Sequence, residues 1–197
     1  MRFFKNNLDI ISKLMINQVG VAIFSFFLYT AAGAINADST ISLTIKISIS
    51  AFAIVFYLVL IYNIVWEVGA KDKIKIDGKR LQRTPQKGIL LGIFANIGNF
   101  AVIGSALVLM LIYMNTGVEA LNSVFAVLNF IFRFFVAMYL GVIQGICSPF
   151  AADKNLYYLT QTIAFLVFSI LSALAIHLSY IMGLNDWRII PSSGKKK

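Results

Sequence analysis

The sequence predicts an all-α, polytopic transmembrane helical bundle of about five spans, and two observations carry that prediction. Of 197 residues, 59% are hydrophobic and only 13% are charged, which is more apolar surface than a soluble domain of this size can bury. The apolar residues also form runs of about 20 residues, the length that an α-helix needs to cross roughly 30 Å of hydrocarbon. Strands would be shorter and would alternate, so a barrel is not expected.

The first predicted element is an N-terminal amphipathic helix over residues 1–16. Its apolar residues repeat at helical spacing (Phe4, Leu8, Ile11 and Met15), and its charged residues fall mostly on the other side (Arg2, Lys5, Asp9 and Lys13). Such a helix lies in the headgroup plane of the bilayer or extends the first span, and the pattern leaves both alternatives open.

A transmembrane domain follows over residues 17–188. Its apolar segments cover about 18–35, 45–66, 88–114, 124–146 and 156–182, with a cytoplasmic basic loop at 67–87 and a basic tail at 189–197. Backbone polar groups inside a membrane must be satisfied internally, so each segment is predicted to be a helix. Thr84 and Pro85 are expected to start the third span, and Asp153 is expected to cap the fifth.

The basic residues predict the orientation. With five spans, eleven basic residues lie on the side of the N-terminus and five on the other, which favours an N-terminus inside. The final lysines, residues 195–197, then fall outside, against the same rule. A re-entrant segment over 121–146 would give fourteen against two, but residues 124–140 contain no Gly or Pro at which such a segment would turn. The five-span arrangement is preferred, and the re-entrant one stays open.

Polar residues inside the predicted spans are the first candidate site, because they are costly in lipid. The intramembrane polar set is Asn96, Asn99, Asn129, Arg133 and Gln144. Arg133 lies near mid-depth, and no carboxylate lies at a comparable depth in the sequence. It is therefore expected to bind amides and carbonyls, to snorkel to the membrane surface, to pair with a carboxylate at the end of a span, or to hold a bound anion.

A set of small residues spaced four apart (Ala137, Gly141 and Gly145) is a candidate helix-packing face that includes a GxxxG motif. Packing inside this bundle is favoured over homodimerisation. The chain carries no sequence signature of an enzyme, so we expect no catalytic residue, no metal site and no cofactor. The basic residues gather at the ends of apolar runs, which makes anionic lipid headgroups the expected partner and argues against nucleic acid.

The second candidate site is the basic loop in WEVGAKDKIKIDGKRLQRTPQKG, residues 66–88. Seven basic residues oppose three acidic ones, a net charge of +4. Its interaction residues are Trp66, Glu67, Lys71, Asp72, Lys73, Lys75, Asp77, Lys79, Arg80, Arg83 and Lys87. Alternation around Asp77 and Gly78 predicts a β-hairpin over residues 73–83, which would meet lipid headgroups or another protein.

The Trp66-Glu67-x-Gly69-Ala70-Lys71-Asp72 segment, with Asp77-Gly78-x-Arg80 behind it, resembles small uncharacterised bacterial integral membrane proteins with a WExGAKD-type segment. The resemblance covers this segment best and the rest of the chain loosely. It brings no activity or ligand. It implies that the loop recurs as a unit. Separately, we expect a multi-pass protein of the bacterial cytoplasmic membrane.

Function is predicted as non-enzymatic, with hypotheses of different classes. One is an accessory or interaction subunit of a larger membrane complex, which binds a membrane protein partner through the 67–87 loop or the GxxxG face. The alternative is a small transport component whose polar intramembrane site holds an anionic ligand or lipid headgroup. A membrane enzyme acting on lipid lacks the residues for catalysis. The first is slightly favoured, because a specific site needs more convergent polar groups than the sequence displays.

Overall fold

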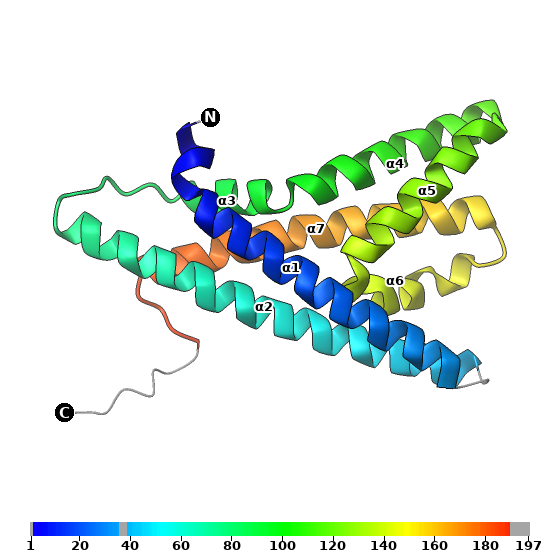
Figure 1. The fold of residues 1–197 in the computed structure, drawn as a ribbon, viewed down its shortest axis with the longest axis horizontal. Helices are drawn as coiled ribbons and strands as arrows, with labels where there is room; N and C mark the ends of the chain where they lie inside the picture. The colour runs from blue at the N-terminus through cyan, green and yellow to red at the C-terminus, as the bar shows by residue number, and fades with distance from the viewer. Residues whose placement is uncertain (1, 36–38, 190–197) are drawn as a thin grey trace.

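The structure is a computed structural model that describes residues 2–35 and 39–189, so most of the predicted basic tail lies outside the described residues. Every regular element in these residues is helical, which confirms the all-α prediction (Figure 1). The α-helices are α1 (Arg2–Ile35), α2 (Ser39–Asp77), α3 (Lys87–Ala95), α4 (Ile97–Thr116), α5 (Glu119–Phe135), α6 (Leu140–Cys147) and α7 (Lys154–Leu184). Two short 3₁₀ helices are η1 (Ala137–Tyr139) and η2 (Ser148–Phe150).

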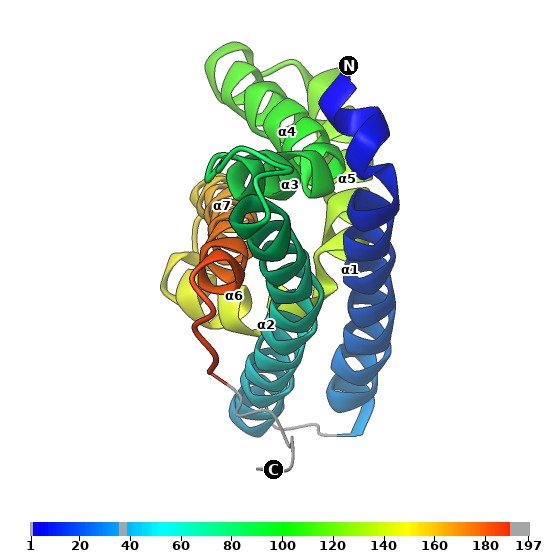
Figure 2. The ribbon, with the colours of Figure 1, turned by 90° about the vertical axis from the view of Figure 1, so that its left-hand side faces the viewer.

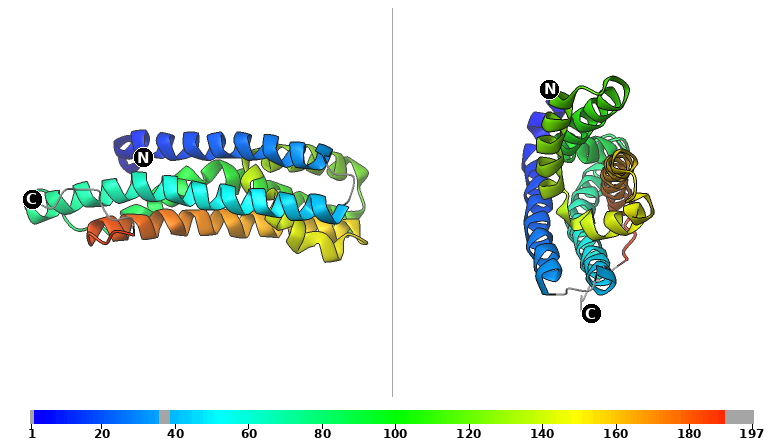
Figure 3. Two further views of the ribbon diagram at one scale, coloured as in Figure 1. Left: turned by 90° about the horizontal axis from the view of Figure 1, so that it is seen from below. Right: turned by 90° about the vertical axis from the view of Figure 1, so that its right-hand side faces the viewer.

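Four helices, α1, α2, α4 and α7, are long and apolar enough to cross a membrane, which indicates a membrane-spanning protein. The views in Figure 1 and Figure 3 agree that α2 and α7 run side by side. Glycines permit this close approach, because a Cβ added to Gly69 would overlap the Tyr180 carbonyl and one added to Gly183 would overlap the Trp66 carbonyl. We call the end where α1 begins and α7 ends the loop end, and the opposite end the cavity end.

Helix α1 is continuous from Arg2 to Ile35. Residues 2–16 therefore belong to the same helix as the first predicted span. Of the apolar face predicted there, Ile11 is buried, whereas Phe4, Leu8 and Met15 are exposed. The buried face is shifted around the helix because α1 packs on its neighbours through Ile11 and Leu14.

The third predicted span is broken, so the prediction of one helix over residues 88–114 is wrong. Asn96 leaves helical geometry at φ −101° and ψ 9°, which divides the segment into α3 and α4. Its Nδ2 donates to the Gly92 carbonyl oxygen at 3.0 Å. The Thr84 carbonyl accepts from the Lys87 amide at 3.1 Å, so Thr84 and Pro85 form a turn just before α3 begins.

The predicted β-hairpin over residues 73–83 is also wrong, because α2 continues to Asp77 and the loop is confined to residues 78–86. The helix ends as Lys79 takes a left-handed φ of 55° and its amide donates to the Ile76 carbonyl at 2.9 Å. Continuing a long helix satisfies each backbone group locally, whereas an isolated hairpin is marginally stable.

The fourth predicted span, residues 124–146, is a bent pair rather than one straight helix. The segments Glu119–Phe135 and Ala137–Phe150 meet at an angle of 84°. Asn122, near the start of the pair, and Lys154, just after its end, line one cavity, so the pair enters and leaves at the cavity end (Figure 1). This is the geometry of the re-entrant alternative. Val136 and the residues of η1 are buried, which shields the irregular backbone from lipid.

Candidate functional site

A cavity of about 390 Å³ lies between α5 and α7 at the cavity end, and we call it the Arg133 cavity. Its lining residues are Asn122, Phe125, Ala126, Asn129, Phe130, Arg133, Lys154 and Tyr158. Two of these side chains are cationic and none of the described lining is a carboxylate. The cavity therefore carries a positive charge inside an otherwise apolar bundle, where the effective dielectric is low.

Arg133 is held at a definite depth in this cavity. Its Nη2 donates to Gln161 Oε1 at 2.8 Å, and Gln161 lies seven residues into α7, about 10 Å along the helix. The Nε atom of Arg133 is buried without a hydrogen-bond partner. The guanidinium makes no ion pair with any described residue. Arg133 thus combines a charge with donor capacity that the protein itself leaves unused.

Asn129 lies one helical turn before Arg133 on α5 and is only 5% exposed. Its Nδ2 is buried and lacks a hydrogen-bond partner. A buried donor without a partner costs about 1–3 kcal/mol. Two such donors in neighbouring turns of one helix, beside one cavity, form a preorganised site for an acceptor with several oxygen atoms.

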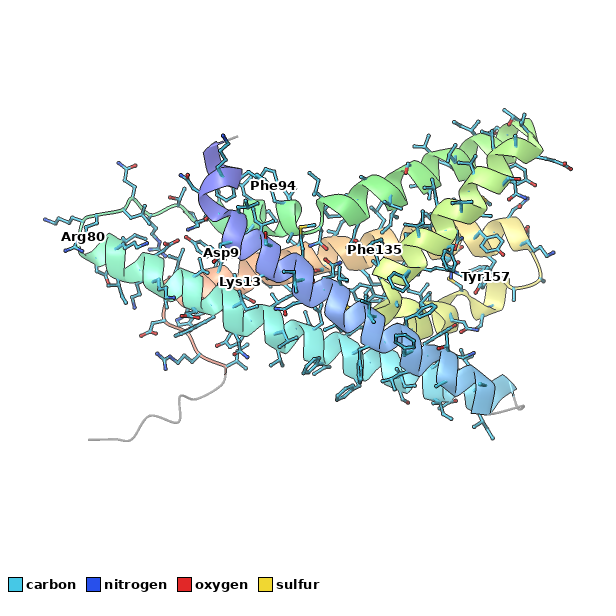
Figure 4. The ribbon with its side chains drawn as sticks, viewed as in Figure 1. Asp9, Lys13, Arg80, Phe94, Phe135 and Tyr157 are labelled. Atoms are coloured by element: carbon cyan, nitrogen blue, oxygen red, sulfur yellow. The ribbon has the colours of Figure 1, made fainter. Side chains whose placement is uncertain are left out.

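The mouth of the cavity is formed by the start of α7. Asp153 Oδ1 accepts from the Asn155 and Leu156 amides at 2.9 and 3.2 Å, which confirms the predicted helix cap. Lys154 is exposed at this mouth and also lines a second cavity of about 240 Å³, with Gln144 and Tyr157. Figure 4 labels Tyr157 at this end of the molecule. The positive end of the helix dipole adds to the charge of Lys154.

Three of the five predicted intramembrane residues, Asn129, Arg133 and Gln144, therefore gather at the cavity end. The Tyr29 hydroxyl donates to Gln144 Oε1 and ties α1 to α6. Lys154 and Tyr158, which line the cavity, and Gln161, which binds Arg133, were not predicted as site residues. Their spacing places them on one face of α7, but that face contains other polar residues and the sequence does not single them out.

The other two predicted residues, Asn96 and Asn99, lie away from the Arg133 cavity. Asn96 is fully buried, and its Nδ2 lies 3.5 Å from Ser172 Oγ. Asn99 Nδ2 donates to Asn96 Oδ1 at 3.3 Å. The Ser172 hydroxyl also lies 3.3 Å from the Tyr57 hydroxyl and beside that of Tyr139. Ser172 therefore links the break between α3 and α4 with the bend between α5 and α6.

Several residues of the predicted interaction loop contact α3 and the end of α7. Asp72 is 4% exposed, and its Oδ2 accepts from Lys87 Nζ at 2.7 Å and from the Tyr180 hydroxyl at 2.9 Å. Trp66 Nε1 donates to the Trp187 carbonyl at 2.7 Å. Figure 2 looks at this end and shows α3 beside the ends of α2 and α7.

Two further loop cations contact the residues that follow α7. Arg83 Nη2 donates to Asn185 Oδ1 at 2.9 Å, and Lys73 lies 4.0 Å from the Asp186 carboxylate. The remaining predicted loop residues are exposed, and they are Glu67, Lys71, Lys75, Asp77, Lys79 and Arg80. Figure 4 labels Arg80 at the tip of this region.

The predicted small-residue face packs inside the bundle. A Cβ added to Gly141 would overlap the Lys46 carbonyl of α2, and one added to Gly145 would lie 2.9 Å from Ile47 Cδ1. Ala137 is buried in η1. The GxxxG motif therefore lets α6 approach α2 of the same chain.

Comparison with known proteins brings no relative: no family model matches the chain, and neither a curated protein nor a solved structure does. The resemblance of the Trp66–Asp72 segment to bacterial membrane proteins stays a prediction.

Proposed function

We propose that the protein is a small membrane transport component that holds an anionic ligand, a free anion or a lipid headgroup, in the Arg133 cavity. One observation carries this proposal. Arg133 Nε and Asn129 Nδ2 are buried donors without partners, and both residues line a cavity with no carboxylate among its described residues. A phosphate or carboxylate group would offer both donors an acceptor and the guanidinium a counter-charge.

The two interrupted segments support a role in transport. The break at Asn96 and the bend after α5 both reach Ser172, which lies near the middle of α7. Interrupted helices that meet inside the membrane are typical of secondary transporters, where they place polar groups at the depth of the substrate. Here α5, which leads into the bend, forms one wall of the cavity.

We further propose that the loop end is cytoplasmic and that the N-terminus lies inside, in a bacterial cytoplasmic membrane. The described basic residues concentrate at the loop end, while Lys46 and Lys154 lie toward the other end. Basic residues favour the cytoplasmic side. The Arg133 cavity then opens to the outer side.

The accessory-subunit hypothesis rests on surfaces that the structure uses partly within the chain. The GxxxG face packs on α2, and Trp66, Asp72 and Arg83 bind residues in or after α7. What stays exposed is a basic strip on α2 and the loop after it, formed by Lys71, Lys75, Lys79 and Arg80. We propose anionic headgroups of the inner leaflet as its contact, since lysines attract such lipids without a specific fit.

The test of the binding step compares two probes, inorganic phosphate and dioctanoyl phosphatidylglycerol, by calorimetry in an uncharged detergent. Dioctanoylglycerol, which lacks the phosphate, is the control ligand. Arg133→Gln should weaken binding roughly 10–100-fold, because a hydrogen bond to a charged group contributes about 1.5–3 kcal/mol. Arg80→Gln, at the opposite end, should bind like the wild type. Equal affinity in the Arg133 variant would overturn the site.

The transport step is tested in proteoliposomes with whichever probe binds. The wild type should move the probe across the bilayer faster than empty liposomes do, and Arg133→Gln should reduce that rate to the background. If the probe binds but does not cross the bilayer, the protein only binds anions, and the transport role is rejected.

A further inference from the structure

A separate cavity of about 300 Å³ lies where α1 meets α3, α4 and α5, and we call it the Gln18 cavity. Its lining residues are Met15, Gln18, Val19, Ala95, Gly98, Asn99, Val102, Phe132 and Phe135. Gln18 and Asn99 are the polar members, and no charged side chain is among these residues. Figure 4 labels Phe135 in the central part of the molecule.

The side-chain amide nitrogen of Gln18 lacks a hydrogen-bond partner in these apolar surroundings. Gln18 is 5% exposed, and its Nε2 is buried without a hydrogen-bond partner. Other polar side chains of α1 donate to their own helix: Ser25 to the Val21 carbonyl at 2.7 Å and Thr30 to the Phe26 carbonyl at 3.0 Å. Gln18 instead keeps an N–H group free beside a cavity, at a cost of about 1–3 kcal/mol.

The lining of the cavity limits what could accept this hydrogen bond. Apart from Gln18 and Asn99 the described side chains around it are apolar, and none of them is charged. A charged group would lose its hydration there without gaining a counter-charge, so the acceptor belongs to an uncharged ligand.

We infer that the Gln18 cavity binds an uncharged, apolar ligand that carries a carbonyl oxygen, as the ring of a lipid-soluble quinone does. Gln18 Nε2 donates to that oxygen, and Phe132 and Phe135 offer aromatic faces or edges to the ring. Asn99 Nδ2 already donates to Asn96 Oδ1, so the Gln18 amide is the free donor. An uncharged ligand suits a lining without charges.

The Gln18 cavity and the Arg133 cavity lie on different faces of α5. Phe132 lines the first, and Arg133 and Asn129 line the second. The Phe132 ring packs edge-on against that of Phe165 of α7, with the ring centroids 5.1 Å apart. The inference therefore stands independently of the proposed anion site, and each can fail alone.

The test uses decylubiquinone as the probe and decylbenzene as the matched ligand without a carbonyl, by calorimetry of the full chain in detergent. The wild type should bind the quinone at least about tenfold more tightly, which corresponds to one hydrogen bond of about 1.4 kcal/mol. Gln18→Met should remove that preference, and Gln82→Met in the exposed loop should keep it. Equal binding of the two ligands by the wild type, or an unchanged preference in Gln18→Met, overturns the inference.

Folding is followed in parallel, because a structural role for Gln18 would also lower binding. Gln18→Met should unfold at no lower a temperature than the wild type, since it removes an unpaired buried donor. Val102→Trp, which fills the cavity from α4, should abolish binding of both ligands while leaving Gln18 in place. Quinone binding that survives Val102→Trp would place the ligand elsewhere and reject the cavity.

Discussion

At the scale of single residues, Asp72 is a buried charge with two hydrogen-bond partners. A carboxylate buried this deeply requires hydrogen bonds and a counter-charge, and it receives them from Tyr180 of α7 and from Lys87 at the start of α3. One side chain of α2 therefore joins three helices at the loop end.

Asp72→Asn should lower the free energy of unfolding by roughly 1.5–3 kcal/mol, because it removes the charge that Lys87 and Tyr180 bind. Cys147 is the single cysteine and is buried, so its reaction with a thiol-specific dye on heating reports unfolding. Asp77→Asn, at the exposed end of α2, is the matched control and should unfold like the wild type. Equal midpoints for the two variants would show that the Asp72 contacts do not support the fold.

Glycine substitutions give a second comparison at this scale. Gly69→Ala should destabilise the protein, because its Cβ would overlap the Tyr180 carbonyl. Gly98→Ala has open space around it and should be neutral or stabilising by up to about 1 kcal/mol, since alanine favours the helix. The same thiol assay measures both midpoints. A stable Gly69 variant would mean that α2 and α7 can separate without loss.

The sequence predicted some site residues and missed others for a physical reason. Arg133 and Asn129 were predictable because a polar group within an apolar run needs a special environment. Gln18 and Gln161 were not, since their roles depend on which helix faces them. Gln161 gains its role from a contact with Arg133, 28 residues away, and no periodic pattern encodes that pairing.

At the scale of elements, the order within WEVGAKD is explained by one helix face. Trp66, Gly69 and Asp72 are spaced three apart, and each contacts α7 or the residues that follow it. The hairpin prediction failed because the alternating lysines and isoleucines after this segment are equally compatible with an exposed helical extension. The main structural role of the segment is therefore to pack α2 against α7, and its charged surface is secondary.

The positions at which the helices are interrupted could not be predicted from the sequence alone. Residues 124–140 contain no Gly or Pro, yet the chain bends at Val136. Tertiary packing sets this turn, since the Tyr139 ring stacks on Phe168 of α7 at 4.9 Å and η1 is buried among its neighbours. The intrinsic helix propensity of these residues does not depend on such a contact. The length of the apolar segment alone therefore predicted a straight span.

At the scale of the whole molecule, the bent pair determines which segments share a side of the membrane. In a Cys147→Ser background, single cysteines at positions 122 and 155 should react with an impermeant maleimide from the same side. Cysteines at positions 78 and 188 should react from the opposite side. Labelling of positions 122 and 155 from different sides would show that α5 and α6 cross the bilayer.

The bond between Arg133 and Gln161 also has a consequence for biosynthesis. When α5 leaves the ribosome, the residue that binds its guanidinium has not yet been made, because Gln161 follows 28 positions later. A charged helix without a partner partitions poorly into lipid. The α5–α6 pair should therefore wait at the membrane surface until α7 has inserted, and then fold inward against it, so the chain assembles out of sequence order.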